Sequence, residues 1–484
     1  MKHIVKSAFF ITVGGALPLL ASVVLLIPYT DNLHTADYGA LAIYISFALL
    51  VQILMNYGVD SYLSVHYYDH HEDPKALKSF LAGITGGLLV YGVLLTVALS
   101  LLSWLLFPLI FPDGSISFWP YGFMSILTGF FNAWFRMYVN IQIYADKARR
   151  YFWFGLFNFI VTVVISAGLI YNSPFSLIGP MWGRLLSGIL IFILALGFGL
   201  KDFGLRFDVN FWKPVKQYST PIVIFSLLTW VLSYINNYIL NALSTPSDVG
   251  IYDFGLKCTL VIEYAGMGLL GTISPRIYQI WKRNGDKISN PEVNRYYHAY
   301  SGLNILLISF NILILPFIIR FFVKNEGYYH SIDLIPILCL GFCFKGLYGV
   351  FINPTLYYKK TNLLPKVMSY SSLIQIFFGF VLTYYFGILG TAFSYFLVKP
   401  IQVYLMWREL KVAFDFQFNF SKMVVAPVTY ILLVITLQLL MAPFYSSWFY
   451  LIQFFLAGLI IIVAYRNEIK AIPELLNKEK VIEG

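Results

Sequence analysis

The chain has 484 residues, of which 59% are hydrophobic and only 12% are charged. A soluble globular fold is excluded, because so few polar residues cannot cover a water-exposed surface of this size. The formal net charge of +10 does not indicate a nucleic-acid partner, because the basic residues are spread over loops between apolar runs, and we interpret it as a signal of membrane topology.

The long apolar runs predict an all-α polytopic membrane protein. A helix needs about 20 apolar residues to cross a bilayer, and these runs lack the period-two alternation of barrel strands. The first run is long enough to be a span and has no clear cleavage site, so we expect no cleavable signal peptide. We predict fourteen transmembrane helices, at about 8–28, 39–58, 80–110, 118–141, 152–171, 177–199, 219–242, 250–274, 299–322, 332–356, 368–386, 390–407, 423–442 and 448–465.

A constant shift of 211 residues relates two parts of the chain. It separates Gly39 from Gly250 and Gly179 from Gly390, four glycines that lie at or near the starts of apolar runs. Such a repeat indicates two related structural units. We predict a six-helix N-lobe, a six-helix C-lobe, and a final pair of helices with a cytoplasmic tail, at residues 1–210, 211–415 and 416–484.

The basic residues favour one side of the membrane. Alternate connecting segments contain 26 of the 33 Lys and Arg residues, whereas the segments between them contain only Arg320 and Lys324. Lys and Arg accumulate in cytoplasmic loops. We therefore expect both chain termini to be cytoplasmic.

The remaining five basic residues are inside predicted spans: Arg136, Arg184, Lys257, Lys345 and Lys399. Each costs about 2.5 to 3.5 kcal/mol to insert, so such residues usually face a wet cavity or a bundle interior. Arg136 is near the inner end of its span and can snorkel to the surface. The other four are about 10 to 20 Å deep. We expect them to share one polar cavity, with separate snorkelling or intramembrane ion pairs as the alternatives.

Two acidic residues accompany Lys257 in its apolar run. Asp253 is four residues before Lys257 on one helix face, so the two can neutralise each other. Glu263 is the stronger candidate for coupling to a proton or sodium ion. A structural role for Glu263, as the partner of one of the lysines, is an equally good interpretation.

Nothing in the loops indicates catalysis or a metal. The longest connections have about 20 residues, and phosphate-binding glycine motifs are absent from the polar loops. A loop cluster contains three histidines and two carboxylates, His66, Asp69, His70, His71 and Glu72. We interpret this cluster as a solvated loop and not as a metal site, and we expect no cofactor.

Four short motifs carry a family resemblance: Ala36-Asp37-Tyr38-Gly39, Tyr57-Gly58-Val59-Asp60-Ser61, Asp248-Val249-Gly250-Ile251-Tyr252 and Gly387-Ile388-Leu389-Gly390-Thr391-Ala392. With the order and hydropathy of nearly the whole chain, they resemble the polysaccharide, or O-antigen, flippase family of the multidrug/oligosaccharidyl-lipid/polysaccharide exporter superfamily. The resemblance implies two six-helix lobes around a central cavity, here with two extra helices. The chain departs from the family pattern at Asn236-Asn237, where many members have an acidic and a basic residue, and at Gln375, where asparagine is common. Coupling roles are therefore not carried over to the seventh helix.

The resemblance implies movement of undecaprenyl-diphosphate-linked oligosaccharide from the inner to the outer leaflet of the bacterial cytoplasmic membrane, by alternating access, for O-antigen or capsule synthesis. A diphosphate in a low-dielectric site needs cations, which Lys and Arg supply through charge-assisted hydrogen bonds. The predicted substrate-binding residues are Lys257, Lys345, Lys399 and Arg184. Coupling to an ion gradient or to the membrane potential is expected. The expected partners are membrane lipids, a polysaccharide polymerase and a chain-length regulator.

Three alternatives stay open. An ion-coupled multidrug exporter of the same fold would more naturally have an anionic cavity for cationic drugs. A membrane-embedded polysaccharide polymerase would need a substantial catalytic loop. A scaffold without transport activity would leave the charges inside the spans unexplained.

Overall fold

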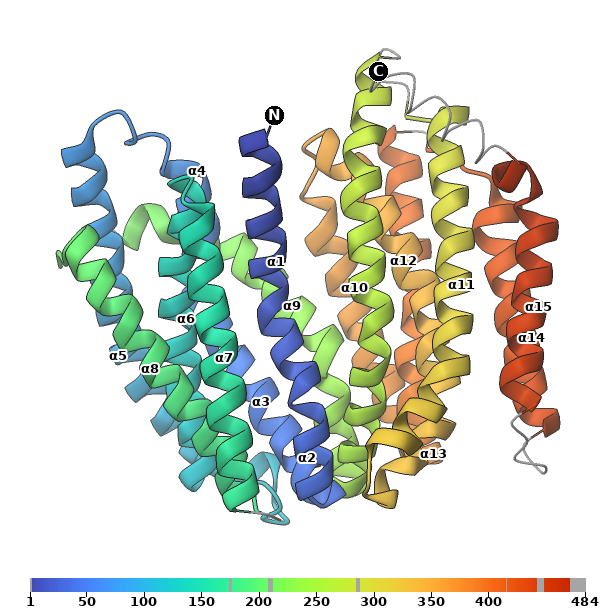
Figure 1. Ribbon diagram of the computed structural model, residues 1–484, viewed down its shortest axis with the longest axis horizontal. Coiled ribbons are helices and arrows are strands. Elements are labelled where there is room, and N and C mark those ends of the chain that lie inside the picture. Colours follow the sequence, from blue (N-terminus) through green and yellow to red (C-terminus); the bar gives the residue numbers. More distant parts are fainter. Residues whose placement is uncertain are drawn as a thin grey trace. The chain divides into compact units, whose positions relative to one another are not determined.

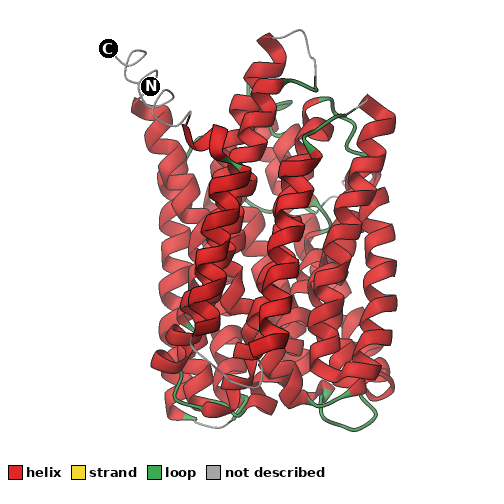
Figure 2. Cartoon of the chain, turned by 90° about the vertical axis from the view of Figure 1, so that its right-hand side faces the viewer, coloured by secondary structure: helices red, strands yellow, loops and turns green. Residues whose placement is uncertain are grey.

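The computed structural model describes residues 2–173, 176–207, 212–283, 288–414, 416–441 and 448–470. Throughout these ranges the regular structure is helical and contains no strand (Figure 2). The all-α class predicted from the sequence is confirmed. Two parts of the predictions lie outside the described residues: Lys287, which is one of the 26 basic residues of the predicted cytoplasmic segments, and the part of the predicted tail from residue 471 onward.

The chain is a multi-pass membrane protein. Within the described ranges, eleven helices are long and apolar enough to cross a membrane, and the shorter apolar helix Trp448–Ala464 follows them. The predicted count of fourteen spans stays a prediction. The eleven are Phe9–Asn32, Thr35–His66, Pro74–Ile110, Ala148–Asn172, Ile178–Asp202, Trp212–Leu243, Pro246–Arg283, Pro291–Phe322, Ile335–Tyr357, Leu363–Phe414 and Ser421–Met441.

The helices belong to two compact units, Met1–Asp253 and Phe254–Gly484. The predicted three-part division stays a prediction. The first unit contains α1 (Lys2–Val24), α2 (Leu26–Asn32), α3 (Thr35–Asn56), α4 (Val59–His66), α5 (Pro74–Ile110), η1 (Phe118–Gly122), α6 (Phe123–Tyr144), α7 (Ala148–Asn172), α8 (Ile178–Asp202), α9 (Trp212–Leu243) and the start of α10 (Pro246–Arg283) (Figure 1).

Helix α6 is the centre of the first unit and packs against α3, α7 and α8. Its Trp134 and Tyr138 are almost completely buried. In a membrane the hydrophobic effect does not drive helices together, because lipid tails are as apolar as the helix surfaces. Close packing at small residues therefore contributes much of the association energy. At the contact with α3, a Cβ added to Gly129 would be 2.8 Å from the Ala48 carbonyl oxygen. The helices can approach this closely only because that position is glycine.

Two of the four glycines that define the sequence repeat, Gly39 and Gly250, meet in the first unit. A Cβ on Gly39 of α3 would collide with the Pro246 carbonyl, and one on Gly250 of α10 would collide with the Thr35 carbonyl. Thr35 and Ser247 also share a hydrogen bond of 2.6 Å between their hydroxyls. The N-terminal ends of these two helices are therefore in reciprocal backbone contact, which any larger side chain would separate.

The second unit contains the rest of α10 and the helices α11 (Pro291–Phe322), η3 (Glu326–Asp333), α12 (Ile335–Tyr357), α13 (Leu363–Phe414), η4 (Ser421–Val425), α14 (Ala426–Met441) and α15 (Trp448–Ala464). Helix α12 is its most enclosed span, and α11, α13 and α14 all pack against it. This central position explains why α12 has little amphipathic pattern, because a helix surrounded by other helices is apolar on every side.

Helix α13 contains two arms joined by a sharp turn at Gly387, where φ is +56° and ψ is −135°. The hydroxyls of Thr383 and Thr391 share a hydrogen bond of 2.9 Å across the turn. Only glycine adopts this backbone conformation without strain. The turn lies between two of the predicted spans, 368–386 and 390–407, and folds one back on the other.

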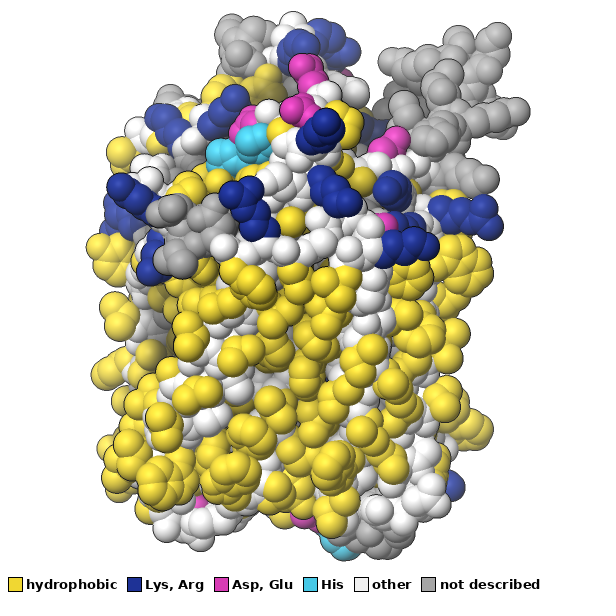
Figure 3. Space-filling view, turned by 90° about the vertical axis from the view of Figure 1, so that its left-hand side faces the viewer, with side chains coloured by type: hydrophobic (Ala, Val, Ile, Leu, Met, Phe, Trp, Pro, Cys, Tyr) yellow, Lys and Arg dark blue, Asp and Glu magenta, His cyan; other side chains and the backbone are white. Residues whose placement is uncertain are grey.

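Basic side chains share one end of the face shown in Figure 3. Lys and Arg gather there above a band dominated by hydrophobic side chains. This distribution is typical of a membrane protein whose basic loops lie on one side of the bilayer.

Candidate functional site

A small pocket lies inside the second unit, between α10, α11 and α12. We call it the polar pocket because polar and charged side chains interrupt its largely apolar lining. Its volume is about 170 Å³, and its lining includes Glu263, Tyr300, Asn304, Lys345 and Tyr348. The Lys345 Nζ atom is 2.7 Å from Glu263 Oε1. The pocket thus contains an ion pair within helices that are apolar enough to span a membrane.

The pocket forms where glycine lets α11 approach α12. A Cβ on Gly346 would be 2.6 Å from Asn304 Nδ2 and 3.0 Å from the Tyr300 hydroxyl oxygen. Asn304 Nδ2 donates a hydrogen bond of 2.9 Å to the Phe342 carbonyl of α12. The missing side chain at Gly346 therefore makes room for two polar groups of α11.

The ion pair is neither fully buried nor fully solvated. The Lys345 side chain is 34% exposed and the Glu263 side chain is 25% exposed. Lys345 Nζ also lies 5.4 Å from the centre of the Phe342 ring, within the range of a cation–π interaction. Such a lysine can exchange its carboxylate partner for another anion, because a phosphate accepts the same charge-assisted hydrogen bond.

A second predicted cation, Lys399, lies on the second arm of α13. Its side chain is buried, and Nζ is 4.7 Å from the centre of the Tyr395 ring. Gly341 of α12 leaves room for the Tyr395 ring, since a Cβ there would be 3.1 Å from Tyr395 Cε1. The charges of Lys345 and Glu263 act electrostatically on Lys399. The second unit thus has one predicted cation paired with Glu263 and a second within electrostatic range of that pair, outside the pocket lining.

The other two predicted cations are elsewhere. Lys257 is half-buried on α10, six residues before Glu263. Arg184 is half-buried on α8 of the first unit, where its Nε atom is buried without a hydrogen-bond partner among the described residues. Because Arg184 and the three lysines belong to different units, the single shared polar cavity expected from the sequence stays a prediction.

The predicted coupling residue Asp253 has a structural partner. It is buried in the first unit, where Asn237 Nδ2 of α9 donates a hydrogen bond of 3.1 Å to its Oδ1. The neighbouring Asn236 donates one of 3.2 Å to the Tyr252 hydroxyl. The asparagine pair that departs from the family pattern therefore fastens α9 to α10.

Arg136 also has a partner that the sequence did not reveal. Its side chain is 63% exposed, as expected for a residue that snorkels, and its Nε is 3.0 Å from Asp60 Oδ2. Asp60 lies in the first turn of α4, within one of the four sequence motifs. Arg136 and Asp60 are distant in sequence, so only the packing of α4 against α6 pairs them.

Sequence reasoning missed the polar neighbours of the ion pair. Tyr300 and Asn304 line the pocket from α11, and Tyr348 lines it from α12. A usable signal existed, since Tyr300 and Asn304 are four residues apart and therefore on one face of an otherwise apolar helix. The glycine that faces them, Gly346, gave no such signal because glycine is common in membrane helices.

The solved structures that this polytopic helical bundle resembles include a flippase and a multidrug transporter. It is similar to the lipid II flippase MurJ in an inward closed conformation, with a TM-score of 0.69 and 15% identity over 96% of this chain and 100% of that chain. It is also similar to an inward-facing multidrug resistance MATE family transporter of the MOP superfamily, with a TM-score of 0.67 and 11% identity over 82% of this chain and 94% of that one.

The family model described as "polysaccharide biosynthesis protein" matches residues 4–281, more than half of the sequence. The chain belongs to this family. No curated protein matches the sequence. The resemblance stated from the four motifs is thereby confirmed, and the fold is similar to that of the two solved structures described above.

Proposed function

We propose that the chain is a flippase for lipid-linked oligosaccharide. It moves undecaprenyl-diphosphate-linked repeat units from the inner to the outer leaflet of the bacterial cytoplasmic membrane, with both of its termini in the cytoplasm, to supply O-antigen or capsule synthesis. One observation carries the proposal: the Lys345–Glu263 pair, with Lys399 nearby, is inside the apolar spans. Family membership supports the polysaccharide substrate class.

The pocket suggests how a diphosphate is held. The substrate's phosphate displaces Glu263 from Lys345, and Lys399 supplies a second positive charge. Tyr300 and Asn304 offer uncharged donors beside them. The polyprenyl tail stays in the lipid, because exposing it to water would cost its burial energy, about 0.8 kcal/mol per CH₂ group.

Release of Glu263 provides a coupling step. A carboxylate that loses its lysine partner in a low-dielectric site binds a proton or a sodium ion more readily. An inside-negative membrane potential also favours outward movement of an anionic head group, by roughly 2.3 kcal/mol per charge per 100 mV. Export of the head group would thus be coupled to an ion that Glu263 carries or to the potential itself.

The second candidate function is ion-coupled export of drugs, since a multidrug resistance transporter has a similar fold. The charges of the pocket favour the flippase. Lys345 lines the pocket with Glu263, and Lys399 lies outside the lining but within electrostatic range of both. The charges in and beside the pocket therefore sum to a positive value, which attracts an anion and repels a cationic drug. A polysaccharide polymerase and a chain-length regulator are the proposed partners.

Complementation tests the proposal. A strain without its own oligosaccharide flippase receives the chain, and surface glycan is measured at matched expression levels. We expect Lys345→Ala and Lys399→Ala to reduce surface glycan about tenfold or more, because a hydrogen bond to a charged group contributes roughly 1.5 to 3 kcal/mol. Lys411→Ala is the matched control, since Lys411 is an exposed lysine of the same unit.

Two outcomes would contradict the proposal. Normal surface glycan in both the Lys345→Ala and Lys399→Ala strains would remove the site assignment. Drug resistance without restored glycan, from the unsubstituted chain, would favour the exporter.

A further inference from the structure

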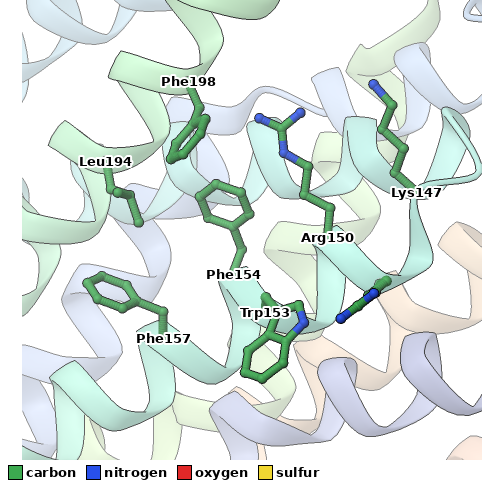
Figure 4. A pocket seen from close by; sticks show the side chains of 8 residues that line it. Lys147, Arg150, Trp153, Phe154, Phe157, Leu194 and Phe198 are labelled. Atoms are coloured by element: carbon green, nitrogen blue, oxygen red, sulfur yellow. The ribbon is translucent and has the colours of Figure 1, made fainter.

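A second and larger cavity lies in the first unit, in the groove between α7 and α8. Its volume is about 710 Å³. Basic residues lie at one end and apolar residues line the rest (Figure 4). The lining residues are Lys147, Arg149, Arg150, Trp153, Phe154, Phe157, Leu194 and Phe198. None of them belongs to the polar pocket of the second unit.

The basic end of the groove is built on an ion pair. Arg150 Nη1 is 2.8 Å from Asp202 Oδ2, on the last residue of α8. The Arg150 guanidinium carbon is also 5.1 Å from the centre of the Phe198 ring. Asp202 accepts a further hydrogen bond of 3.1 Å from the Tyr138 hydroxyl. Arg150 therefore joins α7 to α8, and its positive charge is balanced.

The two other basic residues of the groove keep their charges unbalanced. Lys147 and Arg149 are exposed, and within the described part of the chain neither has an ion-pair partner. Lys147 is the residue before α7, and Arg149 lies in the first turn of α7. The distribution of basic residues predicts that this end of the helix is on the cytoplasmic side. The basic end of the groove consequently carries a net positive charge at the expected level of the lipid head groups.

The rest of the groove is an apolar wall. Trp153 is 54% exposed, Phe157 is 41% exposed and Phe198 is 39% exposed. Arg149, Trp153 and Phe157 are spaced by four residues and therefore follow one face of α7. From Lys147 to Phe157 the helix rises about 15 Å. Over this length the wall changes from cationic to aromatic in the direction of the membrane interior.

We propose that this groove binds one anionic phospholipid of the surrounding membrane. Its phosphate contacts Lys147 and Arg149, and one acyl chain lies along Trp153, Phe157 and Phe198. The charge complementarity selects an acidic head group, which is abundant in the cytoplasmic leaflet. A soluble phosphate would leave the aromatic wall uncovered. The lipid spans the same two helices that Arg150 and Asp202 join, and it reinforces that joint.

Fluorescence quenching tests the proposal on the full chain in nanodiscs. Phosphatidylglycerol with brominated chains is mixed into phosphatidylcholine, and brominated phosphatidylcholine is mixed into phosphatidylglycerol at the same mole fractions. The difference in quenching between the unsubstituted chain and Trp153→Phe isolates the contribution of Trp153. We expect Trp153 to be quenched at a much lower fraction of brominated phosphatidylglycerol than of brominated phosphatidylcholine.

Charge removal is the second arm. Each basic residue at a membrane surface contributes a factor of about five to the attraction of acidic lipid. The double variant Lys147→Gln with Arg149→Gln should therefore need a roughly 25-fold higher mole fraction of brominated phosphatidylglycerol for half of the maximal quenching of Trp153. Lys75→Gln with Lys78→Gln is the matched control, because these two exposed lysines begin α5 in the same unit and lie outside the groove. Thermal unfolding of each variant shows that the fold is retained.

Four outcomes overturn the proposal. The first is equal quenching of Trp153 by both brominated lipids. The second is unchanged selectivity after both groove charges are removed. The third is an equal loss in the control variant, which would indicate general attraction to the surface. Competition by soluble glycerol phosphate at millimolar concentration would also contradict the proposal, since it would show that the head group binds without the chain.

Discussion

The ion pair between Lys345 and Glu263 should stabilise the second unit only while both partners are present. At 2.7 Å, two unit charges attract each other by about 6 kcal/mol if the effective dielectric constant is about 20. Exposed pairs contribute about 0 to 1 kcal/mol, and breaking a fully buried pair costs about 3 to 5 kcal/mol. With side chains 34% and 25% exposed, we expect either single change, Lys345→Met or Glu263→Gln, to lower the free energy of unfolding by about 2 kcal/mol.

The double variant separates stability from transport. Replacing both charges leaves no uncompensated ion, so most of the lost unfolding free energy should return. Transport should stay lost, because the cation that receives the phosphate is gone. Unfolding is followed in detergent with increasing dodecyl sulfate, and transport is followed in proteoliposomes. If the two single losses simply add in the double variant, the pair makes no contribution and the reasoning is refuted.

Two further predictions concern the second unit. Gly346→Ala should lower the unfolding free energy by about 1 to 3 kcal/mol, because the new Cβ would be 2.6 Å from Asn304 Nδ2. The control is Gly268→Ala, where nothing lies within 4 Å of the added Cβ, and it should leave thermal stability unchanged or raise it. Equal losses of stability in the two variants would exclude the packing explanation. Burial raises the pKa of Glu468, but the hydrogen bonds from Lys422 prevail and hold it below the usual 4.5. The stabilising contribution of Glu468 should therefore be complete above about pH 4.5 and disappear as the pH falls through the lowered pKa. Thermal unfolding of Glu468→Gln should not show this loss of stability at low pH. A parallel loss in both proteins would contradict the stabilising role given to Glu468.

The repeat shows where sequence and structure agree. The shift that relates Gly39 to Gly250 was visible in the sequence, and the structure brings these two glycines into reciprocal backbone contact. Two equivalent helices of a repeat can cross at a local symmetry axis. Each helix then contributes the same position to the crossing, so both positions must be small for the backbones to touch. The sequence indicated the positions, but it did not show that they touch each other.

The sequence by itself determined that this is a helical membrane protein, because apolar runs of span length have no other stable form in lipid. It also singled out Lys345, Lys399 and Glu263, because an ionisable side chain in a span is costly wherever it points. Only the tertiary structure decided which charges neutralise each other. Glu263 pairs with Lys345 on another helix, and Asp253 accepts a hydrogen bond from Asn237. Hydropathy and loop charge are properties of the chain taken in order, whereas an ion pair forms over a few ångströms between segments that only packing brings together.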